Sequence, residues 1–202
     1  MRVRFVGEIA GVGSSSGVRV VVGRWVRSPY GEVADAMVET ADGHRVLVAP
    51  SRDLADFIAA TYTFDEVRVE PVELVATAGA RRFTSPSLHL EIEVGRPTAL
   101  GRLVALVPRR IATSPLWCAV TDPVARVVLR GVRTRGSAGG GRREWYGAHD
   151  VRAVVAVRGS FDGVDLGELR PVDPPARFGF SSTPPRPSIT SVVTTIDLPD
   201  ES

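Results

Sequence analysis

The sequence predicts an α+β fold: a mostly antiparallel sheet, curled or barrel-like, with a helical insert around 98–130. Apolar and polar residues alternate with a period of two through much of the first half, a pattern typical of strands with one buried face. Helix-capping signals concentrate in the middle of the chain, and strand patterns return near its end. The regular alternation of strands and helices that a parallel α/β sheet requires is absent.

Strands account for most of residues 2–94. Segments 32–40 and 44–49 form two short strands joined through Asp42-Gly43, a dipeptide that favours a tight hairpin. The chain then predicts a short helix capped by Ser51, because a serine hydroxyl can accept a hydrogen bond from the first helical turn.

Two further strand patterns follow this short helix. Between residues 65 and 77 the apolar phase changes at Pro71, which indicates a bulge or an edge position. Segment 87–94 is the cleanest half-buried strand. It places Leu88, Leu90, Ile92 and Val94 on one face and His89, Glu91 and Glu93 on the other.

The helical insert begins with a candidate helix over 98–107 that stops at Pro108. Ser114-Pro115 and Asp122-Pro123 each place a capping residue before a proline at a first helical position. These two signals predict two consecutive helices, 115–121 and 123–130.

The remainder is predicted to return to the first sheet. A Gly/Arg-rich loop spans 131–146, and returning strands occupy 150–197 with a turn around Asp162-Gly163. A proline-rich stretch, 171–187, is expected to be extended or turn-like. We therefore expect a single domain over 1–198, with a frayed tail at 199–202.

The order of elements over residues 29–77 resembles acetoacetate-decarboxylase-like barrels. It begins at Ser28-Pro29-Tyr30-Gly31-Glu32 and continues as strand, glycine turn, strand, short helix and strand. The resemblance bears on the fold alone, since the Schiff-base lysine of that enzyme has no counterpart here.

Composition excludes several kinds of chemistry. All 25 basic residues of the 202-residue chain are arginine, and lysine is absent, which rules out a Schiff base or a P-loop lysine. The single cysteine, Cys118, excludes an intrachain disulfide and zinc sites built on several thiolates; its apolar neighbours indicate core packing. The start of the chain lacks an apolar leader, and no apolar run reaches membrane-spanning length, so we expect a cytoplasmic protein without a membrane partner.

Charge is distributed unevenly along the chain. Residues 1–80 carry 8 arginines and 11 acids, a net −3; residues 81–150 carry 12 and 5, a net +7; residues 151–202 carry 5 and 7, a net −2. The basic middle therefore draws attention to loop 131–146, where guanidinium groups and glycine backbone amides can approach one anion.

The leading hypothesis is that this loop binds a small anionic ligand, a phosphate or a carboxylate. Four arginines would neutralise the anion, two aromatic rings would pack on it, and one histidine would titrate nearby. These residues are Arg133, Arg135, Arg142, Arg143, Trp145, Tyr146 and His149.

Two alternatives stay open. A metal-dependent or acid/base hydrolase or lyase would use His89 with Glu91 and Glu93 inside a barrel lumen. A nucleic-acid-associated module is disfavoured by the total charge of only +2 and by the lack of a recognition-helix pattern. The sequence predicts no particular metal site, and it leaves catalysis, cofactors and oligomeric state undetermined.

Overall fold

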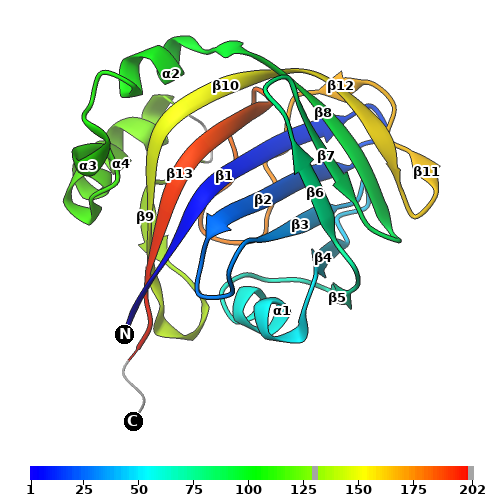
Figure 1. Ribbon diagram of the computed structural model, residues 1–202, viewed down its shortest axis with the longest axis horizontal. Helices are drawn as coiled ribbons and strands as arrows, with labels where there is room; N and C mark the ends of the chain where they lie inside the picture. Colours follow the sequence, from blue (N-terminus) through cyan, green and yellow to red (C-terminus); the bar gives the residue numbers. More distant parts are fainter. Residues whose placement is uncertain (129–131, 200–202) are drawn as a thin grey trace.

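One curled sheet organises the chain in a computed structural model that describes residues 1–128 and 132–199 (Figure 1). Its strands follow the spatial order β5-β4-β3-β2-β1-β13-β10-β8-β7-β6, with β9 and β11 paired to β10 and β12 paired to β1. Strands hold 48% of the residues and helices 16%, which confirms the predicted strand-rich α+β fold. The strands are β1 (Arg2–Ser14), β2 (Arg19–Arg27), β3 (Val33–Glu39), β4 (Arg45–Ala49), β5 (Glu66–Val69), β6 (Glu73–Ala76), β7 (Ala80–Thr84), β8 (Leu88–Pro97), β9 (Arg135–Ser137), β10 (Arg143–Phe161), β11 (Val164–Asp165), β12 (Leu169–Arg170) and β13 (Ser188–Asp197).

Helices lie at two places along this sheet. Helix α1 connects β4 to β5, the one parallel pair among the described strands, and its N-terminus is capped by Ser51 as predicted. The insert lies beside β10, to which α2 and α4 are packed (Figure 1). The helices are α1 (Arg52–Ala59), α2 (Ala99–Val104), α3 (Arg109–Ala112), α4 (Pro115–Val128) and the short 3-10 turn η1 (Gly139–Gly141).

The curl of the sheet brings its two edges together. Strands β5 and β6 end the sheet on opposite sides, yet only residues 70–72 separate them along the chain. The edge position predicted from Pro71 is therefore confirmed, and the phase change arises because two different strands flank the proline.

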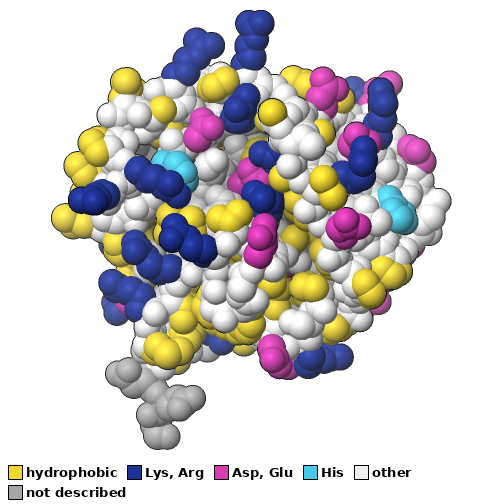
Figure 2. All heavy atoms as spheres, in the orientation of Figure 1, with side chains coloured by type: hydrophobic (Ala, Val, Ile, Leu, Met, Phe, Trp, Pro, Cys, Tyr) yellow, Lys and Arg dark blue, Asp and Glu magenta, His cyan; other side chains and the backbone are white. Residues whose placement is uncertain are grey.

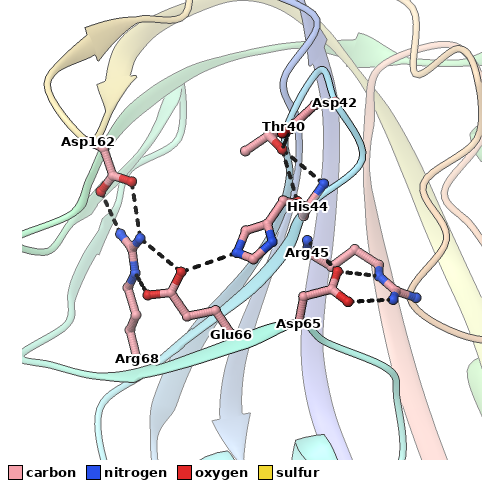
Figure 3. Close-up of polar contacts among 8 residues, drawn as sticks. All are labelled: Thr40, Asp42, His44, Arg45, Asp65, Glu66, Arg68 and Asp162. Carbon is pink, nitrogen blue, oxygen red and sulfur yellow. Dashed lines mark hydrogen bonds and ion pairs between the residues drawn. The ribbon is translucent and has the colours of Figure 1, made fainter.

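A row of charged side chains fastens the β5 edge to the neighbouring turns (Figure 3). Arg68 pairs with Glu66 at 2.7 Å and also with Asp162 in the turn after β10, while His44 Nε2 lies 3.3 Å from the same glutamate. The Asp162-Gly163 turn forms where it was predicted, with both residues at positive φ.

The two faces of the sheet bury separate cores. Even-numbered positions of β1 to β4 point into the curl, where Val12, Val38 and Val48 meet Phe83 and Leu90 from the opposite wall. The described cavity on this inner side has a volume of only about 10 Å³, too small for more than one water molecule. The opposite face is covered by α1 and by part of the extended segment 171–187.

The insert differs from its prediction at Pro123. One helix, α4, runs through this proline instead of two helices meeting there. Asp122 does not start a new helix: its buried carboxylate accepts hydrogen bonds from the backbone N–H groups of Thr134 and Arg135, at 2.9 and 3.3 Å. Ser114 does cap α4, accepting from Trp117 N. Part of the predicted insert and loop falls on residues 129–131, outside the described residues.

Strand β10 begins at Arg143 and not at residue 150, so part of the predicted loop 131–146 is strand. Its first half pairs with β13 from Asp197 to Val192, and this distant partner completes hydrogen bonds that local sequence does not reveal. Strand β13 itself spans 188–197, in agreement with the sequence prediction for that segment.

Candidate functional site

A cavity lies between the sheet and α1, on the face opposite the barrel interior. The cavity volume is about 60 Å³, enough for a few water molecules or a very small organic group. Its walls are mostly apolar, and its polar groups come from strands β2, β3, β10 and β13 and from the loop after α1. The lining residues are Phe5, Ile9, Val21, Gly23, Trp25, Asp35, Met37, Phe57, Ile58, Thr61, Tyr62, Tyr146, Thr194 and Ile196.

Strand register brings these side chains together. Phe5 pairs with Thr194, which in turn pairs with Tyr146, so three strands contribute one row of the cavity wall. In β2, Gly23 leaves space for its neighbours: a Cβ there would lie 2.7 Å from Asp35 Oδ1 and 2.7 Å from Trp25 Nε1.

Asp35 is a carboxyl group buried at this wall, with 2% of its surface exposed. Its Oδ1 accepts a hydrogen bond of 2.9 Å from the indole Nε1 of Trp25. Burial raises the pKa of Asp35 to about 7, and the indole hydrogen bond only partly opposes this. The group can therefore change protonation near neutral pH.

Glu144 is a second buried carboxyl, with no exposed surface. Its Oε2 lies 3.0 Å from the Tyr62 hydroxyl and 2.9 Å from the Tyr146 hydroxyl, and the two hydroxyls are 2.6 Å apart. Oε1 has no partner among the described residues. Burial raises the pKa of Glu144 to about 7, and burial also raises the pKa of both tyrosines.

A count of protons explains why the neutral form of Glu144 suits this cluster. Three oxygen atoms lie within hydrogen-bonding distance of one another, but the two phenols supply only two protons. A protonated carboxyl supplies the third, so every contact has a donor. Ionisation would instead leave an anion with one unpartnered oxygen in an apolar site.

Arg142 lies beside the cavity: it is not one of the lining residues, but it contacts two of them, Phe57 and Thr61. Its Nη1 donates to the backbone carbonyl of Phe57, at 2.7 Å, and to the hydroxyl of Thr61, and its guanidinium lies 4.6 Å from the centre of the Phe57 ring. Within residues 1–128 and 132–199, no carboxylate forms an ion pair with it. The positive charge of Arg142 lowers the pKa values of Tyr30 and Glu144 relative to burial alone.

Of the seven residues predicted to bind an anion, Tyr146 lines this cavity and Arg142 contacts two of its lining residues. Arg143 and Trp145 alternate with Glu144 and Tyr146 along β10 and therefore project from the other face. There the centre of the Trp145 ring lies 5.9 Å from the guanidinium of Arg143 and 5.7 Å from that of Arg2.

The other three predicted residues are elsewhere. The backbone of Arg133 is hydrogen-bonded to Ser181, and Arg135 is an exposed residue of β9. His149 lies at a bulge of β10, where burial and the charge of Arg109 lower its pKa. The ligand-binding role of the full set stays a prediction.

The three residues of the hydrolase or lyase alternative do not lie inside the barrel. His89, Glu91 and Glu93 project outward from β8 and are exposed, because the apolar residues between them occupy the packed barrel interior. Glu91 instead pairs at the surface with Arg82, at 3.3 Å. In the described ranges, no three histidine, cysteine or carboxylate side chains gather in a way that could hold a metal ion.

Sequence reasoning missed Trp25, Asp35, Tyr62, Glu144 and Thr194. One signal was available: Glu144 and Tyr146 stand two residues apart, so they share a face if the strand begins before residue 150. Tyr62 and Thr194 carry no comparable local signal, because only the tertiary fold places them beside the carboxyl groups.

These features define a curled, strand-rich α+β protein with an internal cavity. No protein-family model matches the chain, and no curated protein matches it in sequence. Among solved structures, an acetoacetate decarboxylase from Legionella pneumophila subsp. pneumophila str. Philadelphia 1 is similar over 98% of this chain and 84% of that chain, with 8% sequence identity and a TM-score of 0.45. No helix within the described ranges is long and apolar enough to cross a membrane.

Proposed function

We propose that the chain binds a short monocarboxylate, with the apolar part of the ligand in the cavity under α1 and its carboxylate at Arg142. The observation that carries this proposal is the Arg142 guanidinium, which is held against the cavity-wall residues Phe57 and Thr61 and has no ion-pair partner among the described residues. Its remaining N–H groups are suited to a carboxylate, which guanidinium groups bind in a two-pronged geometry.

The shape and polarity of the cavity favour a carboxylate with a small apolar body over inorganic phosphate. Phe5, Ile9, Met37 and Ile196 give the wall an apolar surface that a fully hydrated phosphate would not complement. The volume of about 60 Å³ is well below the roughly 150 Å³ of a cavity that takes up benzene. The enclosed part of the ligand is therefore only a few carbon atoms, as in propionate.

Replacing Arg142 with alanine should weaken propionate binding by about 10- to 100-fold, the effect of losing a charge-assisted hydrogen-bonded pair. Propionate can be titrated below pH 7, where Asp35 and Glu144 are mostly neutral. The indole N–H resonance of Trp25, which is hydrogen-bonded inside the cavity, reports occupancy by NMR.

Arg143→Ala is the matched control, because it removes the same charge from the adjacent residue on the other face of β10. We expect this variant to bind propionate like the original chain. Equal losses in the two variants would point to general electrostatic attraction, and unchanged binding in Arg142→Ala would refute the proposed site. Inorganic phosphate, used as a second probe, should leave the Trp25 resonance unmoved.

A second candidate function, proton transfer to or from the bound molecule, is favoured by the two carboxyl groups at the cavity. A general acid or base works best when its pKa lies near the working pH, and both Asp35 and Glu144 have a pKa of about 7. The phenol groups of Tyr62 and Tyr146 connect Glu144 to the cavity and can pass a proton along their hydrogen bonds.

This second function predicts that the protein catalyses exchange of the methyl protons of pyruvate with deuterium from heavy water. Glu144, acting through the hydroxyl of Tyr62 or Tyr146, would take up the proton released from the methyl carbon and return a deuteron by the same route, so no other reactant is consumed. Glu144→Gln should reduce the exchange rate at least about 100-fold, within the usual contribution of a general base. Loss of the methyl signal, followed by NMR, measures the rate. An exchange rate equal to that of buffer, or an unaffected Glu144→Gln variant, would exclude this role.

A further inference from the structure

The helical insert presents an apolar surface that none of residues 1–128 and 132–199 covers. In the part of the chain that the structure describes, each exposed leucine or isoleucine lies between residues 103 and 116. Leu106 and Leu116 are 80% and 76% exposed. Single exposed apolar side chains are common on protein surfaces, but a group of them is unusual and marks an interaction site. We call this set the insert surface; it comprises Leu103, Leu106, Ile111, Leu116 and Val120.

The charged side chains in the segment that forms this surface are all arginines. From residue 96 to residue 121 the chain has four arginines and no acidic residue. The four are Arg96, Arg102, Arg109 and Arg110. Each is exposed, and none has an ion-pair partner among the described residues. In Figure 2 dark blue and yellow side chains gather over α2, α3 and α4, while most of the magenta side chains lie across the rest of the visible face.

We propose that the insert surface binds peripherally to anionic lipid bilayers. Exposed leucines can enter the boundary between headgroups and acyl chains, while arginines beside them contact lipid phosphates and carboxylates. Trp117, partly exposed on α4, adds the amphipathic ring that is enriched at this depth of a bilayer. The sequence had predicted no membrane partner, and this mode of contact needs no spanning helix.

A second copy of the chain fits this surface less well. In a symmetric dimer the same patch meets itself, which would bring the arginines of both copies into one interface to which residues 96–121 contribute no acid. The acidic residue that follows the segment, Asp122, is buried and bonded to the backbone of residues 134 and 135. An anionic bilayer supplies the missing negative charge over the whole surface.

The test is co-sedimentation of the full chain with vesicles of phosphatidylcholine alone or mixed with phosphatidylserine. We expect binding to the mixed vesicles that weakens as salt rises. Arg109→Ala together with Arg110→Ala should lower the partition coefficient about 25-fold, since each arginine near an anionic surface contributes about fivefold. Leu106→Ser with Leu116→Ser should lower it at least about tenfold.

Matched controls lie outside the insert surface. Arg52→Ala removes an exposed arginine of α1, and Val164→Ser removes a valine that is 66% exposed on β11; both should partition like the original chain. Absence of binding to mixed vesicles, or equal binding by all variants, would overturn the proposal. Sedimentation equilibrium adds a third outcome: a dimer that Leu106→Ser with Leu116→Ser converts to monomer, without lipid binding, would assign the surface to a second copy instead.

Discussion

Replacing Glu39 with alanine is expected to lower the free energy of unfolding by about 3–5 kcal/mol, the cost of leaving a buried charge without its partner. Glu39 has no exposed surface, and its Oε1 lies 3.2 Å from Arg19 Nη2, whose side chain is also buried. Its Oε2 accepts the backbone N–H of Arg177 at 2.8 Å. The residue therefore joins the β2–β3 hairpin to the segment that covers Met37 and Val21.

Urea unfolding of three variants separates the buried charge from the surface contact. Arg177 also reaches Glu39, at 3.1 Å, but its side chain is 70% exposed, so Arg177→Ala should cost less than about 1 kcal/mol. Arg19→Met with Glu39→Leu removes both buried charges, and it should recover much of the stability that Glu39→Ala loses. A loss below about 1 kcal/mol in Glu39→Ala would show that the buried pair is not needed for stability.

Local signals predicted the elements whose partners lie nearby in the sequence. The hairpin of β3 and β4 follows from Asp42-Gly43, and α1 follows from its Ser51 cap. Where the partner is distant, the same reasoning fell short. The start of β10, Arg143, pairs with Asp197 of β13, more than 50 residues later, so the predicted strand began seven residues too late.

The candidate site was harder to predict because both faces of the sheet are buried. Asp35 alternates with Ala34 and Ala36 in β3, which in an isolated half-buried strand indicates a solvent-facing carboxylate. In the folded chain that face lies under α1 and the proline-rich segment, so the carboxyl is buried instead. Period-two alternation shows which residues share a face but does not show what covers that face.

The net positive charge of residues 81–150, and not strand alternation, indicated part of the candidate site. The basic segment contains Arg142, which contacts the cavity-wall residue Phe57, and Arg143, which contacts Trp145 instead. A one-residue step along an extended chain reverses the direction of the side chain, so two adjacent arginines with equal charge have different surroundings. The charge of the sequence therefore indicated the segment, but it could not show which of the two adjacent arginines lies near the cavity.

The two buried carboxyl groups should make the protein less stable as pH rises from about 5 to about 8. Their pKa values in the folded chain are about 7, against ordinary values of 3.8 for Asp35 and 4.5 for Glu144. A raised pKa means that the folded state holds its proton more tightly than the unfolded state. The resulting stability is fully present below the unfolded pKa and is lost as pH rises through about 7, at a cost of roughly 2–3 kcal/mol for each group over this interval.

Other titrating groups do not produce the same trend. The lowered pKa of Asp65, about 2, stabilises the fold at all pH values above the acid range and changes little in this window. His149 has a lowered pKa, so its contribution has the opposite sign: it is present above the unfolded pKa and is lost as pH falls. A comparison of variants at each pH removes this contribution, because His149 is common to all of them.

Glu144→Gln and Asp35→Asn, whose amides do not ionise, provide that comparison. Each variant should lose about half of the pH dependence seen in urea midpoints between about pH 5 and pH 8, and the double variant should be nearly flat. The amide of Asp35→Asn retains an oxygen that accepts from Trp25, and that of Glu144→Gln an oxygen that accepts from the tyrosine hydroxyls in place of one donated bond, so most of the contacts are kept. Parallel profiles for the original chain and the double variant would show that both carboxyls ionise at ordinary pH. In that case the proton count that favours a neutral Glu144 would be wrong, and so would the neutral cavity assumed for carboxylate binding.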